Sequence, residues 1–479
     1  MDDGLAYLGA TELVAGYRDG ALSPVDAIAE ALARIERFEP VLNAFTLVDG
    51  DGARARARES EARWRDGAPM GALDGVPMTL KDIVLIKGWP TLEGSRTTDP
   101  ERDWNEDCPA VARLREAGAI FLGKTTTPEF GWKGMTDSPL SGITRNPWNP
   151  DLTPGGSSGG AGAALAAGIG ALAFGTDGGG SIRIPASYCG LYGIKPNFGR
   201  VPHYPQESPF AGVVCGGPLA RSVADAALML NVISRPDARD GFALPPDGRD
   251  WRDGLDDGVA GLRLAYAPAL GGAEAAPDVL SVVAEAVRVF TGLGAHVEEV
   301  GPVFDPPRPQ FEAYWLAGFA HRLRAIPPAK RDLMDPGLRA LAEHGLAVSI
   351  EDYCAAMAAR ARLAARMSAL HEDFDLLLTP TMPTPPPPVD MPYHSPGFDR
   401  WRHAVPFTVP FNLTGQPAAS IPCGVCASGM PVGLQIVGPR FGEALVLRAS
   451  RAFEAALARP YPRPALAALA GASPTVSSY

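Results

Sequence analysis

Helix and strand patterns alternate along much of this chain, and this alternation constrains the fold more than any other feature. In "CPAVARLREAGAIFLGKT", residues 108–125, an amphipathic helix ends near Gly118 and a short apolar strand follows. The stretches "GLRLAYAP", "DVLSVVAEAVRVFTGLG" and "AHVEEV" repeat the order as strand, helix and strand. Such alternation is typical of α/β proteins, in which helices cover a largely buried sheet. No fixed-period repeat is present, which argues against a solenoid or a propeller.

Capping residues mark the starts of two predicted helices. Ser23 suits the N-cap of the first, Pro24 its first position and Asp26 its third. Ser222 and Asp225 form a similar capping pair at the start of "SVADAALMLNVI". Both helices therefore have starts that the local sequence specifies.

The composition is that of a globular protein with enough apolar material for a core. Of 479 residues, 46% are hydrophobic and 20% charged, and the net charge of −11 comes without a long basic run, which argues against nucleic-acid or anionic membrane partners. The longest apolar segment, Ala161–Phe174, is too short to span a bilayer and predicts a buried helix. Because the six cysteines do not indicate a disulfide framework and the acidic N-terminus lacks a secretory signal, we expect a cytoplasmic protein.

Two segments are expected to be irregular. Ser234–Gly258 is rich in Pro, Gly and Asp and predicts a surface connection that could divide two lobes. Thr379–Pro392 is so rich in proline that it must be extended, and we interpret it as a rigid connector, with a pocket rim as the alternative. Beyond it, residues 417–425 and 430–439 predict two strands around a turn, followed by a helix from about Gly442.

The stretch "TPGGSSGG", residues 153–160, formally matches the nucleophile elbow G-x-S-x-G with either Ser157 or Ser158 at its centre. An elbow needs a preceding strand, whereas "TRNPWNPDLTP" contains three prolines and cannot form a regular one. None of the seven histidines stands in a setting that marks a base, and no lysine follows the glycines as in a Walker loop. An anion nest at the start of the next helix stays open.

A second glycine run, Gly178–Gly180, leads into Ser181. Its N–H groups could form an oxyanion hole with Ser181 as the attacking hydroxyl, and a tight structural turn is the alternative. A serine needs a base, and Lys81 lies in the apolar run "GVPMTLKDIVLIKG", where burial would lower its pKa. Lys87 and Lys124 are competing candidates, and the ordinary role of a lysine is a surface salt bridge.

A metal site has little support. Cys423 and Cys426 form a CxxC pair without a second pair, in an apolar strand-to-turn setting, and no H-E-x-x-H motif occurs. We therefore expect two small buried side chains rather than metal ligands.

Taken together, these stretches resemble the amidase signature family. The matching text is "GVPMTLKD", "TPEFGWKGMTDSPLSGITRNPWNPDLTPGGSSGG", "GTDGGGSIRIPASYCGLYGIKPNFGRV", "PFNLTGQPAASIPCG" and "PVGLQIVGPRFGE", in the family's order and spacing from about the first helix to residue 455. The resemblance implies a single large α/β domain, residues 1–479, whose mixed, twisted sheet is covered by helices on both sides. Residues 1–70 would form an N-terminal helical part, 71–225 the catalytic core, and 259–460 the remaining sheet and pocket elements.

The resemblance also implies a Ser–cis-Ser–Lys triad. Ser181 matches the nucleophile, Ser157 the bridging serine that follows a cis peptide bond, and Lys81 the base. The matching oxyanion-hole residues are Gly178, Gly179 and Gly180, together with the Ser181 amide, and the matching supporting polar residues are Ser158, Asp177 and Arg183. Neither a metal nor an organic cofactor takes part in this chemistry.

We therefore expect an amidase that converts a small-molecule carboxylic amide to an acid and an amine or ammonia. The catalytic subunit of a glutamyl-tRNA amidotransferase and an inactive binding protein on the same fold are the alternatives, and the resemblance also suggests a homodimer. Pocket walls are expected from residues 132–137, 203–210, 311–324 and 379–407. The predicted substrate-binding residues are Met135, Thr136, Trp132, Phe210 and Trp315.

Overall fold

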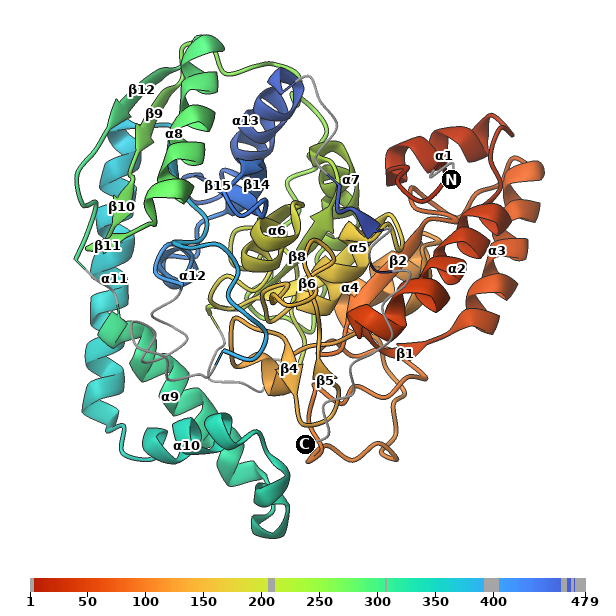
Figure 1. Cartoon of the computed structure of the whole chain (residues 1–479), viewed down its shortest axis with the longest axis horizontal. Coiled ribbons are helices and arrows are strands. Elements are labelled where there is room, and N and C mark those ends of the chain that lie inside the picture. Colours follow the sequence, from red (N-terminus) through yellow and green to blue (C-terminus); the bar gives the residue numbers. More distant parts are fainter. Residues whose placement is uncertain are drawn as a thin grey trace.

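An eleven-stranded sheet runs through the computed structural model, which describes residues 4–205, 212–305, 308–391, 405–457, 463–466 and 469 (Figure 1). In spatial order its strands are β1 (Phe45–Val48), β3 (Ile120–Thr125), β2 (Pro77–Lys81), β6 (Leu172–Asp177), β8 (Cys215–Ala220), β7 (Tyr192–Lys195), β14 (Ala418–Val425), β15 (Pro431–Val437), β13 (Leu376–Pro380), β9 (Arg263–Tyr266) and β12 (His296–Glu299). Two short hairpins lie outside it: β4 (Asp137–Ser138) with β5 (Gly142–Ile143), and β10 (Ala269–Leu270) with β11 (Ala273–Glu274).

The sheet is mixed. Strand β2 pairs in parallel with both β3 and β6, and β9 pairs in parallel with β12 and β13. From β6 through β8, β7, β14 and β15 to β13, every neighbouring pair is antiparallel. The α/β fold with a large mixed sheet, predicted from the sequence, is confirmed.

Helices gather along the whole sheet, with α1–α3 beyond its β1 end and α11 beside β9 and β12 in the view of Figure 1. The helices of the described chain are α1 (Ala10–Arg18), α2 (Pro24–Leu42), α3 (Gly50–Arg65), α4 (Pro109–Glu116), α5 (Gly159–Ala166), α6 (Arg183–Cys189), α7 (Val223–Ile233), α8 (Pro277–Gly292), α9 (Arg308–Ala325), α10 (Pro336–Gly345), α11 (Ile350–Asp373), α12 (Val409–Leu413) and α13 (Glu443–Ala456), with 3-10 turns at Glu129–Gly131 and Pro328–Leu333. None of these helices combines the length and the apolar character that crossing a membrane requires.

Both faces of the sheet are packed. Side chains alternate along a strand, and in β6 Ala173 belongs to an apolar cluster with Leu165 of α5 and Ala186 of α6. Its neighbours Leu172 and Phe174 belong instead to the large cluster on the other face, which includes residues of α7 and α8. The catalytic-core strands are therefore buried on both sides, which explains their near-continuous apolar sequence.

The predicted helix starts are present, with one difference in how they are capped. The Ser23 hydroxyl accepts the Val25 N–H at 2.9 Å, and Pro24 occupies the first turn of α2. At α7, Ser222 Oγ accepts the Asp225 N–H at 3.2 Å, but the Asp225 carboxylate does not return to Ser222. It accepts from the Thr11 N–H at 2.8 Å instead, so it joins α7 to α1 rather than completing a capping pair.

The buried helix predicted for Ala161–Phe174 is wrong in its second half. Helix α5 ends at Ala166, and Gly168 and Gly170 take left-handed backbone angles, with φ of 75° and 76°. A helix cannot continue through such residues, so the chain turns and enters β6 at Leu172. Apolar composition alone could not distinguish one buried helix from a helix followed by a buried strand.

The proline-rich segment braces the serine-rich stretch. The Thr153 N–H donates to the Pro387 carbonyl at 3.0 Å, and the Val389 N–H donates to the Asp151 carbonyl at 2.9 Å. This part of the segment therefore lies beside the residues that lead into Gly155 and Ser157. The predicted hairpin and its helix follow as β14, β15 and α13.

Candidate active site

Lys81 stands at the carboxyl end of β2, between two parallel strands in the interior of the sheet. Its side chain is fully buried, and Nζ donates to Ser157 Oγ at 2.7 Å and to Thr176 Oγ1 at 3.0 Å. Burial lowers the pKa of Lys81 to about 7, partly opposed by the negative charge of Asp177. A large fraction of Lys81 is therefore neutral near pH 7 and can accept a proton.

Ser157 lies in the turn that joins the braced segment to α5. The Gly156–Ser157 peptide bond is cis, as the family resemblance implied. A Cβ on Gly156 would lie 2.7 Å from the Met135 carbonyl oxygen, so only glycine fits against this backbone. Thr136 Oγ1 donates to the Gly155 carbonyl at 2.8 Å. Met135 and Thr136, predicted to bind substrate, instead support this turn from behind and do not line the cavity.

Ser181 follows the glycine run after β6 and directly precedes α6. Only 8% of its surface is exposed, and it lines the same cavity as Ser157. The Ser158 N–H donates to the Ser181 carbonyl at 3.2 Å, and Ser158 Oγ donates to the Thr176 carbonyl at 3.2 Å. Ser158 therefore ties the two serine-bearing turns together and to β6.

The glycine run does not present all of its N–H groups to the cavity. The Gly180 N–H donates to Asp177 Oδ1 at 2.7 Å, so it is already engaged. Within the described residues, no acceptor takes the N–H of Gly178, Gly179 or Ser181. Gly180 has a φ of 126°, and a Cβ there would lie 2.4 Å from Thr408 Oγ1. Gly180 thus shapes the loop, while the other three amides are available to an oxyanion.

Asp177 and Arg183 form a fully buried ion pair beneath this loop. Arg183 donates to both Asp177 carboxylate oxygens, at 2.9 and 3.0 Å, and to Asn412 Oδ1 at 2.7 Å and Gln435 Oε1 at 2.8 Å. Burial raises the pKa of Asp177, but the charge and hydrogen bonds of Arg183 outweigh it and hold that pKa well below its usual range. Thr408 contributes its carbonyl oxygen to Arg183 at 2.9 Å.

Four residues of this network were not predicted from the sequence: Thr176, Thr408, Asn412 and Gln435. The only signal for the last two was a polar side chain inside the otherwise apolar stretches "PFNLTG" and "PVGLQIVGP". Buried polar groups require partners, so such positions can be flagged, but their partner more than 200 residues away cannot be read from sequence.

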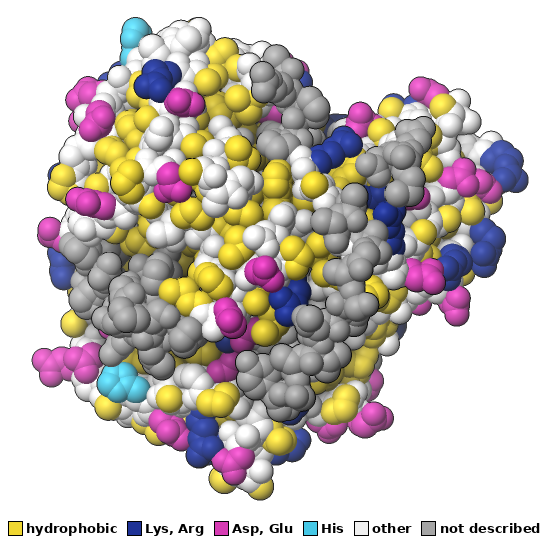
Figure 2. All heavy atoms as spheres, viewed as in Figure 1, with side chains coloured by type: hydrophobic (Ala, Val, Ile, Leu, Met, Phe, Trp, Pro, Cys, Tyr) yellow, Lys and Arg dark blue, Asp and Glu magenta, His cyan; other side chains and the backbone are white. Residues whose placement is uncertain are grey.

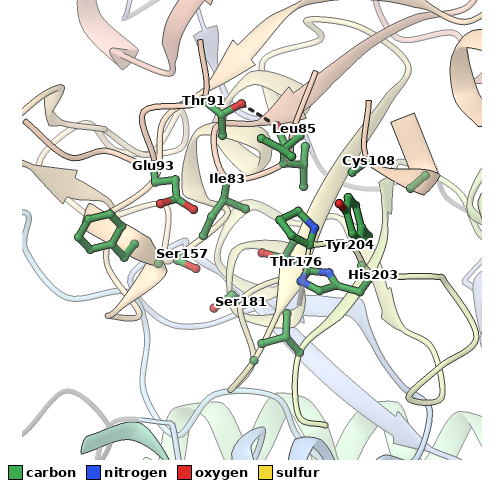
Figure 3. Close-up of a pocket in the computed structure, with 18 of the residues that line it drawn as sticks. Ile83, Leu85, Thr91, Glu93, Cys108, Ser157, Thr176, Ser181, His203 and Tyr204 are labelled. Atoms are coloured by element: carbon green, nitrogen blue, oxygen red, sulfur yellow. Dashed lines mark hydrogen bonds between the residues drawn. The ribbon is translucent and has the colours of Figure 1, made fainter. Parts of the chain in front are cut away.

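The serines open onto a cavity of about 210 Å³. Figure 3 shows Glu93 and Ser157 toward one end and His203 and Tyr204 toward the other, with Ile83 between them. Its walls are largely apolar, from Ile83, Val84, Leu85, Phe174, Val214, Trp315 and Phe319, and its polar lining includes Thr91, Glu93, Arg102, His203, Tyr204 and Arg322. The cavity therefore suits an uncharged group near Ser181 and offers charged groups farther away.

The face of the molecule drawn in Figure 2 mixes apolar side chains with both signs of charge, and no extended basic patch stands out among its described residues. Lysines and arginines there alternate with aspartates and glutamates. This face therefore offers no continuous basic surface of the kind that a polyanion would bind.

The predicted pocket residues fare unequally. Trp315 lines the cavity, whereas Trp132 is buried in the core, where its carbonyl oxygen accepts the Trp315 indole N–H at 3.1 Å. Phe210 and most of the 393–407 wall lie outside the described residues. A tryptophan in sequence does not reveal whether it packs in the core or faces a cavity, and here the two kinds are in contact.

Competing nucleophiles and bases have other environments. Lys124 is paired with Asp82 at 2.8 Å, and Lys87 is exposed. Burial raises the pKa of Cys108, the thiol on the cavity wall, to about 11, so it stays protonated near neutrality. Burial lowers the pKa of His203, which keeps its ring neutral. Within the described residues, no three His, Cys, Asp or Glu side chains gather as a metal site would require.

Comparison with known proteins places this geometry in a family. A family model described as "Amidase" matches residues 26–447. An acylamidase of Rhodococcus erythropolis is 34% identical over 95% of this chain and 96% of its own length, and a glutamyl-tRNA(Gln) amidotransferase component of Myxococcus xanthus, its A-type subunit, is 35% identical over 94% and 97%. The crystal structure of a bacterial aryl acylamidase of the amidase signature enzymes superposes with a TM-score of 0.89, at 31% identity, over 97% of this chain and 99% of its own.

Proposed function

Because the chain belongs to the amidase signature family and is an enzyme that hydrolyses amide C–N bonds, we propose that Ser181 is its nucleophile, with Ser157 and Lys81 as the proton relay. One observation carries the proposal. A fully buried lysine, with its pKa lowered to about 7, donates directly to the hydroxyl of a serine that shares the cavity with Ser181. A base of this kind can activate a serine hydroxyl without a histidine.

The proton moves toward Lys81 in the first half-reaction. Neutral Lys81 takes the Ser157 hydroxyl proton, and Ser157 takes that of Ser181 as Ser181 Oγ attacks the amide carbonyl carbon. The relay then returns the proton to the amide nitrogen as the C–N bond breaks, which releases the amine and leaves an acyl-Ser181 ester. Water enters by the same route, and its attack releases the acid and restores the Ser181 hydroxyl.

Amides of the glycine loop stabilise the oxyanion in this mechanism. The N–H groups of Gly178, Gly179 and Ser181 are its donors, because the Gly180 N–H is held by Asp177. Asp177 is in turn fixed by Arg183, so the loop does not reorganise when charge develops. Rigid donors aimed at developing charge are worth about 2.7–4 kcal/mol each in acyl-transfer enzymes.

The substrate is a small-molecule amide with an apolar acyl or aryl group beside Ser181. The walls nearest the reacting serines are aliphatic and aromatic, and Trp315 and Phe319 project from one face of α9 into the cavity. The acylamidase relatives support the same class of substrate, since their names state acyl or aryl-acyl amides.

Glutamine hydrolysis, as in the catalytic component of an amidotransferase, is the second candidate. It rests on the 35% identity to the M. xanthus protein over nearly the whole chain. The two candidates separate in one assay: purified enzyme is given aryl amides, aliphatic amides and glutamine, and the products are quantified. Ammonia release from glutamine without anilide hydrolysis would favour the amidotransferase type, and the converse favours an acylamidase.

Replacement of Ser181 by alanine tests the nucleophile. We expect the variant to fold, to lose amide hydrolysis, and to escape labelling by a fluorophosphonate that labels the wild type at Ser181. Arg18, at the end of α1 and remote from the cavity lining, offers a matched control as Arg18→Ala, which should keep both activity and labelling. Wild-type turnover by Ser181→Ala would rule out the mechanism.

A further inference from the structure

One end of the cavity is built from three residues that the mechanism does not use: Glu93, Phe130 and Arg322, here called the charged end. The Arg322 guanidinium carbon lies 4.0 Å from the centre of the Phe130 ring, and the same group forms an ion pair with the Glu93 carboxylate. Trp315, Phe319 and Arg322 occupy one face of α9, so the helix that walls the apolar part also supplies the cation.

The backbone at the charged end is held in an unusual conformation. Glu93 and Phe130 are two of four non-glycine residues with positive φ in the described chain, at 56° and 54°. Each is followed by a left-handed glycine, Gly94 and Gly131, and the Phe130 N–H donates to the Glu93 carbonyl at 2.7 Å. Non-glycine residues persist in this region only where the surroundings enforce it, and they concentrate at binding sites.

A buried carboxylate fixes the same loops. Glu129, next to Phe130, is fully buried and accepts from Ser95 Oγ at 2.5 Å and from the Asp335 N–H at 2.6 Å. Ser95 belongs to the loop that carries Glu93, and Asp335 caps α10, which follows α9. The three segments that form the charged end are therefore tied together through Glu129.

The charges that line the cavity do not balance. Glu93 contributes one carboxylate, whereas Arg102 and Arg322 contribute two guanidinium groups. A guanidinium has five N–H donors, and one carboxylate engages at most two of them at a time. Arg322 therefore keeps donors for a further acceptor after it pairs with Glu93, and the excess positive charge favours an anionic one.

We propose that Arg322 binds a carboxylate of the substrate, remote from the scissile amide, while Glu93 and Phe130 hold its guanidinium in place. The substrate class is then amides that carry an acidic group on the acyl or the amine part, with an apolar portion beside Ser181. This inference rests on the proposed function, because Ser181 must react in the same cavity.

The test compares acidic and neutral anilides of matched size. Glutaric acid monoanilide places a carboxylate on the acyl part and is compared with hexananilide, and 4-(butanoylamino)benzoate places one on the amine part and is compared with butananilide. Each is assayed for kcat and KM with the wild type, Arg322→Met and Arg322→Lys. Arg324→Met, an exposed arginine on the same helix and outside the cavity, is the matched control.

In the wild type, at least one acid should exceed its neutral partner in kcat/KM by about tenfold or more, as a charged hydrogen bond provides. Arg322→Met should lose this preference, chiefly through KM, and change the neutral anilides less than about twofold, whereas Arg324→Met should behave as wild type. If Arg322→Met does not fold, Arg322→Lys still decides, because a lysine cannot form the bidentate pair and should reduce the preference severalfold.

Equal rates on acidic and neutral anilides, or an equal loss on all four substrates in Arg322→Met, would overturn the inference and leave the proposed function standing. Wild-type hydrolysis of all four anilides by Ser181→Ala would instead overturn the proposed function and, with it, the inference.

Discussion

Two fully buried lysines stand on neighbouring strands, yet the structure prepares them for opposite tasks. Lys81 ends β2, and Lys124 lies on β3 beside Leu80, the residue before Lys81. Since residues in register face the same side and successive residues alternate, the two side chains leave the sheet on opposite faces. Lys81 meets the serines, and Lys124 meets Asp82.

Their partners determine what burial does. Lys124 Nζ contacts Asp82 Oδ1 at 2.8 Å, the Pro90 carbonyl at 2.9 Å and Thr91 Oγ1 at 2.6 Å. Burial lowers the pKa of Lys124 and raises that of Asp82, and the opposite charge of each partner counters both shifts. Lys81 donates to two hydroxyl groups, those of Ser157 and Thr176, so burial is opposed weakly and its pKa falls to about 7.

Burial by itself therefore does not make a lysine a base. A direct carboxylate partner makes Lys124 an anchor for the loop that carries Thr91 and Glu93, both on the cavity wall. Neutral partners make Lys81 a proton acceptor. Removing each lysine should consequently harm different properties of the protein.

Lys81→Met should cause the largest effect. We expect kcat for amide hydrolysis to fall by about 10⁴-fold or more, because residues of a catalytic relay act as a unit. The free energy of unfolding should stay equal or rise, because a poorly compensated buried amine is replaced by an apolar side chain of similar length. Steady-state kinetics and denaturant unfolding check the two halves. Substantial turnover by Lys81→Met would remove Lys81 from the mechanism.

Lys124→Met should show the reverse pattern. It leaves the Asp82 carboxylate buried without its cation, which should lower the free energy of unfolding by about 3–5 kcal/mol. Activity should fall less than in Lys81→Met, through displacement of the loop that lines the cavity.

The double variant Asp82→Leu/Lys124→Met is the control for this prediction, because it removes both charges and should recover most of the lost stability. Urea unfolding of the three proteins measures the coupling. Equal stability of the wild type and Lys124→Met would mean that the pair is not an anchor.

The sequence distinguished these lysines only through family resemblance. Apolar neighbours predicted burial for Lys81, but Lys124 lies in an equally apolar strand, "AIFLGKT". What separates them is the partner: Asp82 follows Lys81 in the chain yet pairs with Lys124, because alternation sends it to the other face. Local pattern could predict strands, helix starts and the two serine turns, since these depend on neighbouring residues.

Long-range contacts account for most of what could not be predicted from the sequence. Asn412 and Gln435 meet Arg183 across more than 220 residues, and Asp225 turns to Thr11 across 214. Trp132 and Trp315 differ in role only because one lies behind the cavity wall and the other forms it. Such choices are made by tertiary packing, which periodicity and capping motifs do not encode.

The pH dependence should follow Lys81 and not Lys124. Because protonated Lys81 cannot act as a base, kcat/KM should fall about tenfold per pH unit below pH ~7 and level off above it, so that pH 5 gives about a 100-fold loss. A pH–rate profile with a neutral anilide measures the midpoint. A flat profile between pH 5 and pH 8 would contradict a neutral Lys81.

Stability should carry the same signature. The pKa of Lys81 falls from 10.5 to about 7 on folding, so between these values the unfolded chain binds more protons and the free energy of unfolding rises with pH. That contribution is complete above pH ~10.5 and lost as pH falls to about 7. Lys81→Met should lack this slope, whereas the double variant Asp82→Leu/Lys124→Met should keep it.

Thr176→Val should give the smallest effect and sharpen the comparison most. Thr176 Oγ1 accepts from Lys81 Nζ at 3.0 Å, and valine keeps the shape while removing this acceptor. Because a lone neutral hydrogen bond contributes about 0.5–1.5 kcal/mol, kcat should fall by up to about tenfold with KM nearly unchanged. The hydroxyl also stabilises the ammonium form, so its loss should move the midpoint of the pH–rate profile downward. Thr91→Val removes the matching acceptor from Lys124 and should leave that midpoint in place. If both variants moved it equally, the two lysines would be electrostatically coupled, and the contrast between base and anchor would not hold.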